Sequence, residues 1–460
     1  ALFFGNRGFF PASLMESARK EVTENITKLG YDYIILDVEA TRHGAVETPE
    51  EGKIFARFLE ENKEGYDGII LSLPNFGDEN GAVEALKHAD VPIYIQAYPD
   101  ELDKMAPDKR RDSFCGKFSI MDVFKQYGIP FSVYKPHTVH PGSDDFAKNI
   151  DTFARVCSVV KGMKEMRVGA IGARTTPFKT VRIDELALQK YGITTETFDL
   201  SEIFARMRAL SENNVELQEK REILSNYASW QGVPEVNFDN IARYGVVLDQ
   251  VIAENDLDAV AVRCWIEIQQ EFGISPCVVL SELNNRLGIG ACEVDIGSAV
   301  TMRALSLASG DVATCLDWNN NYQDEENKCI LFHCGPVPAK LMREKGKVVD
   351  HEILKNNVGP GCSYGPNVGR MKAGEFTYGN LRTEDGRLEF YLGEAAFTDD
   401  PVPGDFFGCA GVAEFSDLQN TLLSIGCLGH RHHVSLTPGK VLFPVYEAFT
   451  NYLGYDVDIV

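Results

Sequence analysis

Short apolar segments alternate with longer helical stretches over roughly the first 160 residues, and this alternation restricts the fold of the chain more than any other feature. Residues 33–38, 68–73 and 91–95 are mostly apolar, whereas residues 49–62 show the spacing of a helix. Strands that are apolar along their whole length and are separated by helices are typical of a parallel sheet covered on both faces. The pattern therefore predicts an α/β domain of the doubly wound kind.

A second region of the same type begins near residue 166. We expect strands at residues 166–172 and 259–262, and an exposed helix over the charged stretch 211–222. Gly169 and Gly172 match part of a dinucleotide-binding motif, but its third glycine is absent. We therefore predict a second doubly wound domain that binds no nucleotide cofactor.

The composition changes after about residue 310, where glycine and proline become frequent and helical periodicity fades. Short β-type segments such as residues 387–392 indicate a third domain of mainly antiparallel strands, for which a small barrel is a suitable form. The chain has 460 residues, more than one hydrophobic core usually serves. We expect two doubly wound parallel-sheet domains, at residues 1–163 and 164–310, followed by a mainly β domain at residues 311–460.

Composition also limits the partners of the chain. The net charge of −23 argues against nucleic acid, although local arginines could still bind an anionic substrate. No run of 18 apolar residues is present, and the apolar N-terminal stretch is too short for a signal peptide, so we expect no membrane partner. The eleven cysteines include no Cys-x-x-Cys pair, which suits reduced thiols. We therefore expect a cytoplasmic protein.

Two acidic sites in the second half stand among apolar neighbours. Glu293 and Asp295 are two residues apart, so they would point to one side of a strand or follow its end in a loop. Alternatively they begin a helix, because residues 296–307 show helical spacing and acidic side chains favour the first turn. Asp317 is a single acid between apolar residues, and a loop or cap position would explain it as well as a functional role.

Histidines provide the other candidates. His333 ends an apolar strand, where a structural histidine is the ordinary interpretation. Three of the nine histidines lie within residues 430–433, beside a glycine, which favours a metal or proton-transfer role. Carboxylates and imidazoles without a close thiol pair suit a cation such as Mn²⁺ that keeps positions open for a substrate, whereas a structural zinc site would normally include cysteines.

The same segments resemble the L-fucose/L-arabinose isomerase superfamily, and the resemblance extends through nearly the whole chain. Each motif is short, but their order and spacing match the family. The motifs are residues 5–11, 110–117 and 172–174, Arg263-Cys264-Trp265, Cys292-Glu293-Val294-Asp295, Asp317, His333-Cys334-Gly335 and His432-His433-Val434. The chain is shorter than L-fucose isomerase and is most similar to a compact branch that includes proteins resembling sulfoquinovose isomerases.

The resemblance implies one Mn²⁺ ion at the junction of the second and third domains. Its ligands would be Glu293, Asp317 and His432, with His433 as the alternative to His432. His333 resembles a further ligand of the arabinose isomerases. The resemblance also implies isomerisation through a cis-enediol, with Glu293 and Asp317 as the candidates for base and acid in an order that stays open. The cation would stabilise the charge that develops as the enediolate forms.

The resemblance also suggests a substrate and an assembly. A 6-sulfonated glucose, sulfoquinovose, is one candidate, and a neutral aldose such as L-fucose or L-arabinose is the alternative. Arg7 and Arg431 lie in predicted loops and could bind a sulfonate, and Trp265 is the third candidate for substrate binding. Family members are commonly trimers or hexamers with active sites at subunit boundaries. A homo-oligomer in which the Arg7 loop approaches a neighbour's metal site is therefore expected.

Two other classes of protein share some of these features. Tandem α/β domains also occur in sugar-binding proteins without catalytic activity, but such a protein would need a secretion signal and would have no use for a third domain with clustered acids and histidines. A metal-dependent hydrolase would share the ligand types but would usually show denser histidine motifs. We therefore favour an aldose–ketose isomerase.

Overall fold

The computed structural model describes residues 1–460, and the chain divides into two compact units. The N-terminal unit contains residues 1–161 and 451–454, and the larger unit contains residues 162–450 and 455–460. None of the helices combines the length and the apolar character that crossing a membrane requires.

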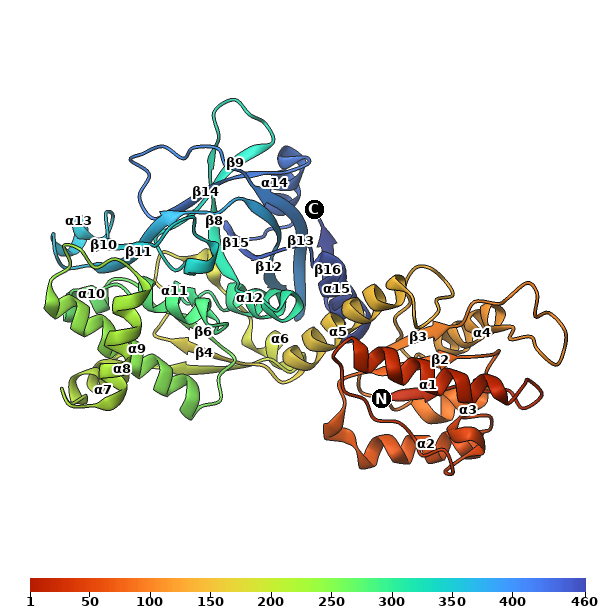
Figure 1. Ribbon diagram of the computed structural model, residues 1–460. Coiled ribbons are helices and arrows are strands. Elements are labelled where there is room, and N and C mark those ends of the chain that lie inside the picture. Colours follow the sequence, from red (N-terminus) through yellow and green to blue (C-terminus); the bar gives the residue numbers. More distant parts are fainter. The chain divides into compact units, whose positions relative to one another are not determined.

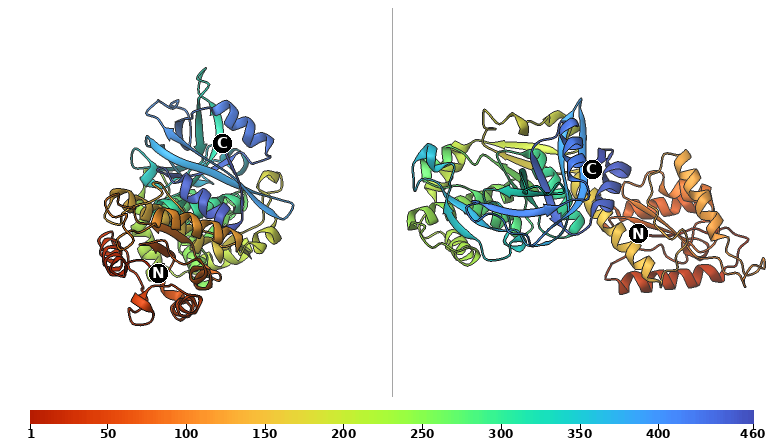
Figure 2. Two further views of the ribbon diagram at one scale, coloured as in Figure 1. Left: turned by 90° about the vertical axis from the view of Figure 1, so that its right-hand side faces the viewer. Right: turned by 90° about the horizontal axis from the view of Figure 1, so that it is seen from above.

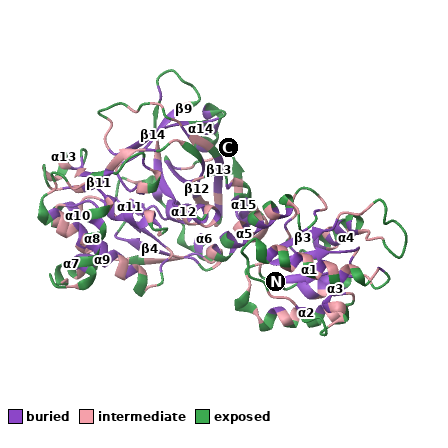
Figure 3. Ribbon diagram, in the orientation of Figure 1, coloured by how far each residue is buried: buried purple, intermediate pink, exposed green.

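The N-terminal unit is built on a parallel sheet of order β1-β2-β3 (Figure 1). Phe3 and Leu71 face a core formed with α2, α3 and α4, whereas Ile70 and Tyr94 face a core formed with α1 and α5. Helices therefore cover both faces of the sheet, as the apolar strands predicted, and the strands are buried (Figure 3). The elements are β1 (Leu2–Phe4), α1 (Ser13–Lys28), α2 (Pro49–Glu61), β2 (Ile69–Leu73), α3 (Glu79–Leu86), β3 (Ile93–Ala97), α4 (Ser113–Gln126) and α5 (Asp144–Lys164).

The strand expected at residues 33–38 is not formed, and that prediction was wrong. Only Ile35 pairs, with Leu2, in an isolated bridge. Strand β1 pairs with β2 over all three of its residues but with this segment at Leu2 alone. Tyr33 and Val38 are exposed, so burial does not hold the whole segment against β1, although Leu36 is buried and Ile35 packs against the core.

The larger unit begins with a parallel sheet of order β5-β4-β6-β7. After β4, the chain adds β5 next to one edge of β4 and then returns to add β6 next to its other edge, which is the doubly wound arrangement. Ligands of such sheets usually bind beyond the carboxyl ends of the strands. The elements are β4 (Arg167–Ile171), α6 (Glu185–Lys190), β5 (Thr194–Phe198), α7 (Leu200–Ala209), α8 (Val215–Tyr227), α9 (Glu235–Glu254), β6 (Ala259–Val262), α10 (Glu267–Phe272), α11 (Cys277–Asn285), β7 (Gly290–Cys292) and α12 (Ile296–Ser309).

A mainly antiparallel barrel follows, as expected (Figure 1; Figure 2). Its strand order is β14-β9-β8-β15-β12-β13, and pairing of β13 with β14 closes it. Strands β10, β11 and β16 extend the sheet. The elements are β8 (Thr314–Asn321), β9 (Lys328–His333), β10 (Lys347–Asp350), α13 (Lys355–Val358), β11 (Tyr364–Arg370), β12 (Gly374–Glu384), β13 (Arg387–Phe397), β14 (Cys409–Glu414), α14 (Leu418–Cys427), β15 (His433–Pro438), α15 (Leu442–Glu447) and β16 (Asp456–Ile459).

Helix α12 joins the parallel sheet to the barrel. It contacts β6 and β7 of the sheet and also β12 and β15 of the barrel, and most of its residues are buried. A helix that is apolar on nearly every side has to be enclosed in this way. The sheet and the barrel thus share one compact unit, and the division into three domains at residues 163/164 and 310/311 stays a prediction.

Candidate metal centre

A tight turn after β7 separates the two acids of the Glu293-Val294-Asp295 motif. Glu293 and Val294 both have left-handed backbone conformations, with φ of 65° and 57°. Such conformations cost about 1–3 kcal/mol each for residues other than glycine, and they are concentrated at functional sites. Asp295 then caps α12 by accepting a hydrogen bond of 3.0 Å from the amide of Ser298. Glu293 is therefore a loop residue at a strand end, and Asp295 begins a helix.

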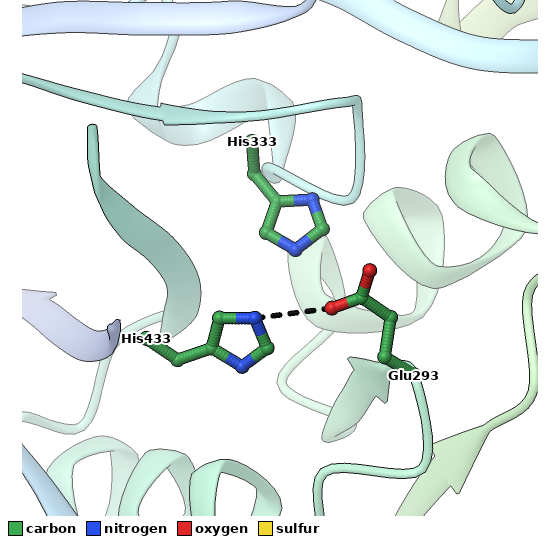
Figure 4. A group of neighbouring side chains, drawn as sticks. All are labelled: Glu293, His333 and His433. Atoms are coloured by element: carbon green, nitrogen blue, oxygen red, sulfur yellow. Dashed lines mark ion pairs between the residues drawn. The ribbon is translucent and has the colours of Figure 1, made fainter. Parts of the chain in front are cut away.

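His433 lies between these two acids. Its Nδ1 is 2.7 Å from Oδ2 of Asp295, and its Nε2 is 3.0 Å from Oε2 of Glu293 (Figure 4). The register of β15 against β8 sets His433 opposite Asp317, whose Oδ1 is 3.5 Å from Nε2 of His433. The imidazole is buried. Burial alone would lower its pKa, but Cys315 and the hydrogen-bonded Asp295 and Glu293 raise the pKa well above its usual range.

Asp317 lies on β8 at the same place. Its Oδ1 is buried and has no hydrogen-bond partner. Burial is the main cause that raises the pKa of this carboxyl group, and the nearby Glu293 raises it further. A buried carboxylate oxygen without a donor is costly unless a cation compensates it.

The other two histidines lie on either side of His433. His333, at the end of β9, accepts a hydrogen bond of 2.9 Å from the amide of Cys334 at Nδ1. Together with Glu293 and His433 it offers ligand atoms that all lie within 4.8 Å of one another (Figure 4). His432 precedes β15 and is more exposed, with its Nε2 3.8 Å from Oδ1 of Asp317. Asp317, His432 and His433 form a second such group.

The donor set of these residues fits a divalent cation of the Mn²⁺ type. The two groups share His433 and contain carboxylate oxygens and imidazole nitrogens but no thiol. A third group of possible ligand atoms, from Asp295, Cys315 and His433, includes a thiol, but all three of its residues are buried. Such a set matches the preference of Mn²⁺ better than that of a structural zinc ion. The partnerless oxygen of Asp317 is an independent indication that a cation belongs here.

Arg431 has a different position from the one expected of a substrate contact. Its guanidinium forms an ion pair with Asp295, and both side chains are almost completely buried. A Cβ on Gly297 would lie 2.6 Å from Nη1 of Arg431, so the glycine in the first turn of α12 leaves room for this pair. Arg431 thus lies behind His433, on the side of Asp295.

A pocket of about 310 Å³ opens onto the metal-centre residues. Glu293, Asp317, His333 and His432 line it, and so does Trp265, whose indole Nε1 donates a hydrogen bond of 3.3 Å to Oε1 of Glu293. The ring of Phe178 also lines the pocket, 5.5 Å from the ring of His432 and 5.8 Å from that of His433. No lysine or arginine is among the residues that line this pocket.

Arg7 belongs to the N-terminal unit and lies in the loop after β1. Its Nε donates a hydrogen bond of 2.9 Å to the carbonyl of Gly77, its guanidinium lies 4.1 Å from the centre of the Phe76 ring, and it forms an ion pair with Glu79. Phe9 of the same loop is 76% exposed. The loop is therefore held in place at Arg7 but presents an apolar side chain at its surface.

Comparisons with known proteins identify the family to which the chain belongs. A family profile described as "Fucose/sulfoquinovose isomerase, N-terminal domain" matches residues 1–164, and one described as "L-fucose isomerase, C-terminal domain" matches residues 331–460. The sulfoquinovose isomerase of Alkalicoccus urumqiensis is 26% identical over 345 residues, which are 74% of this chain and 74% of that protein. The sulfoquinovose isomerase of Priestia aryabhattai is 24% identical over 403 residues, or 86% of each chain. The chain therefore belongs to the fucose/sulfoquinovose isomerase family, and it is an aldose–ketose isomerase.

Proposed function

We propose that the chain is a metal-dependent isomerase that acts through a cis-enediol and that Glu293, Asp317 and His433 hold its cation, with His333 completing the set. The observation that carries this proposal is the buried Oδ1 of Asp317, which accepts no hydrogen bond although Nε2 of His433 lies 3.5 Å away and Nε2 of His432 lies 3.8 Å away. Among the two neighbouring histidines, we favour His433 as the ligand because it is buried and belongs to both groups of donors. His432 is then a pocket residue beside the ion.

The chain's own residues carry the proton transfer in this proposal. A bound cation supplies Lewis acidity, which stabilises the charge that develops on the sugar oxygens. Glu293 and Asp317 both line the pocket, so one carboxylate can remove the proton from C2 and the same or the other can return it to C1. The hydrogen bond from Trp265 orients Glu293 for this role. Phe178 limits access of water from one side.

Metal removal tests this function first. Purified protein is expected to bind about one Mn²⁺ ion per chain, since the donors form a single cluster. Chelation should abolish conversion of aldose to ketose, and Mn²⁺ should restore it better than Mg²⁺, because imidazole ligands suit Mn²⁺ better. Metal content by mass spectrometry and ketose formation would be measured together. Full turnover in a rigorously metal-free sample would refute the metal role, and binding of sugars without any turnover would favour a sugar-binding protein.

The substrate we propose is sulfoquinovose. The support is that the similar proteins are named sulfoquinovose isomerases and that the N-terminal family description includes this sugar. A sulfonate is a permanent anion, and its binding site needs fixed donors. No arginine or lysine lines the pocket of the larger unit, so a positively charged side chain for the sulfonate has to come from outside this pocket. We propose Arg7 of a neighbouring subunit in a cytoplasmic homo-oligomer, a trimer or hexamer.

The sulfonate proposal predicts a specific loss in one variant. Wild-type protein should show a higher kcat/KM for sulfoquinovose than for glucose, L-fucose or L-arabinose. Arg7→Ala should lower the sulfoquinovose value by about tenfold or more, as loss of a charge-assisted hydrogen bond worth about 1.5–3 kcal/mol would. The values for the neutral sugars should change much less. Arg57→Ala, on the exposed face of α2, is the matched control.

Mixed oligomers separate the two parts of this proposal. If Arg7 serves a neighbour's pocket, subunits carrying Arg7→Ala and subunits carrying Glu293→Gln should regain activity when they are refolded together, since some sites then receive both intact residues. A neutral sugar with a kcat/KM equal to that of sulfoquinovose would refute the sulfonate proposal but not the isomerase activity. Full activity of a dilute monomer would refute the proposal that a neighbouring subunit contributes Arg7.

A further inference from the structure

Four thiols lie at one side of the pocket, and three of them, Cys264, Cys277 and Cys334, line it. Cys264 follows β6, Cys277 begins α11, Cys292 ends β7 and Cys334 follows β9. The thiols of the other three raise the pKa of Cys292, so the four lie close together and form one cluster. All eleven cysteines of the chain are free thiols. The proposed isomerisation uses none of these four.

Within this cluster, the side chains of Cys277 and Cys334 approach each other closely. Their Sγ atoms are 3.8 Å apart, which places the two sulfurs in contact without a bond. Both side chains line the 310 Å³ pocket, so a small molecule that enters the pocket can reach them. Cys334 is half-buried, whereas Cys277 is 1% exposed. Cys334 also directly follows His333 in the chain.

We propose that Cys277 and Cys334 form an oxidisable thiol pair, a modification site for hydrogen peroxide or a similar small peroxide. In the first step the more accessible thiol of Cys334 reacts with hydrogen peroxide to give a sulfenic acid and one water molecule. In the second step the thiol of Cys277 attacks this sulfur, and a disulfide and a second water molecule form. The two thiols lose two electrons in total, and the peroxide accepts them.

The disulfide would disturb the candidate metal centre through His333. Bond formation shortens the distance between the two sulfurs from 3.8 Å to about 2.05 Å, so the chain segments that carry them have to move. Helix α11, which Cys277 begins, is tied to the segment after Cys334, because the side chain of Ser281 donates to the carbonyl of Val337 and that of Asn284 to the carbonyl of Pro336. His333 lies at the end of β9, next to the moving residue. A displacement of about 1 Å at a catalytic site can lower turnover about a hundredfold.

Peroxide treatment of the Mn²⁺-loaded full-length protein tests the proposal with two separate measurements. Peptide mass spectrometry is expected to show a link between Cys277 and Cys334, and this result does not depend on the isomerase assay. Turnover, which rests on the proposed function, is expected to fall at least tenfold and to return after reduction with dithiothreitol. Cys277→Ala and Cys334→Ala should each abolish both the link and the reversible loss. Cys329→Ala, which removes a buried thiol elsewhere on β9, should leave both unchanged.

Each of the other outcomes would count against the proposal. A link from Cys334 to Cys292, or no link at all under conditions that oxidise the exposed Cys115, would overturn the assignment of the pair. A loss of turnover that persists in Cys277→Ala and is not reversed by dithiothreitol would show damage at the metal centre instead of a thiol switch. A link between Cys277 and Cys334 without loss of turnover would refute the effect on His333 while leaving the isomerase function standing.

Discussion

Glu293→Gln and Asp317→Asn are each expected to lower kcat by about a hundredfold or more, which is the usual contribution of general acid–base catalysis. Both substitutions keep the size of the side chain and remove its ability to transfer a proton. Steady-state assays with sulfoquinovose and a neutral aldose would measure the loss. Glu271→Gln removes an exposed carboxylate of α10 that pairs with Arg208 of α7. This control should leave kcat within about twofold of the wild type, because such surface ion pairs contribute little.

Two further measurements separate proton transfer from metal binding. Mn²⁺ affinity has to be determined for each variant, and kcat has to be compared at saturating metal, because both residues are also proposed ligands. Exchange of the substrate's C2 hydrogen with solvent gives the direct test of the enediol route. Complete retention of that hydrogen in the product would indicate a hydride shift and would refute proton transfer by either carboxylate.

The parts of the fold that the sequence predicted share a simple physical origin. Residues 68–73 and 259–262 are mostly apolar because both faces of these strands are covered, and this is visible in the sequence as a run in which only Ser72 is polar. The same type of run at residues 33–38 fails to form a strand: it pairs with β1 at Leu2 alone, and Tyr33 and Val38 are exposed. An apolar run therefore predicts a strand only where the fold covers it, and that covering depends on contacts far away in the chain.

The candidate site could be predicted down to its residue types but not to its geometry. Asp317 and His333 stand out as polar residues among apolar neighbours, but the local pattern explains each as well by a structural role, and the family resemblance is what assigns them to the site. The sequence alone does not distinguish the adjacent His432 and His433, and in the structure both approach Oδ1 of Asp317. The register of β15 against β8 sets His433 opposite Asp317, and this imidazole is buried between Glu293 and Asp295, whereas His432 is more exposed.

The position of Arg431 could not be predicted for a related reason. An arginine beside a glycine in a predicted loop indicates an exposed cation that is available to an anionic substrate. Its actual partner, Asp295, lies 136 positions earlier in the chain, and no local pattern indicates that pairing. Asp295 itself was visible as the second acid of a motif, but the backbone turn at Glu293 and Val294 sends the two acids to opposite nitrogens of His433.

Asp295→Ala is expected to reduce both the stability and the metal affinity of the protein. The carboxylate accepts hydrogen bonds from the amide and the hydroxyl of Ser298, holds Nδ1 of His433 and neutralises the buried Arg431. Burial would raise its pKa, but Arg431 and His433 lower the pKa well below its usual range, so the group is charged. Removing one partner of a buried ion pair costs about 3–5 kcal/mol of unfolding free energy. Urea unfolding of the metal-free protein would measure this loss.

The effect on metal affinity has a separate cause and needs its own control. A carboxylate at Nδ1 fixes the tautomer of a histidine so that Nε2 presents its lone pair, and loss of such a partner typically weakens metal binding about 10–100-fold. The double variant Asp295→Ala/Arg431→Met removes the unpaired charge, so it should regain much of the stability but not the Mn²⁺ affinity. Asp199→Ala, which removes an exposed cap of α7 that accepts from the amide of Ser201, should cost only about 1 kcal/mol and leave Mn²⁺ binding intact. If the double variant recovers wild-type Mn²⁺ affinity as well, Asp295 serves only to neutralise Arg431, and its proposed role in orienting His433 is wrong.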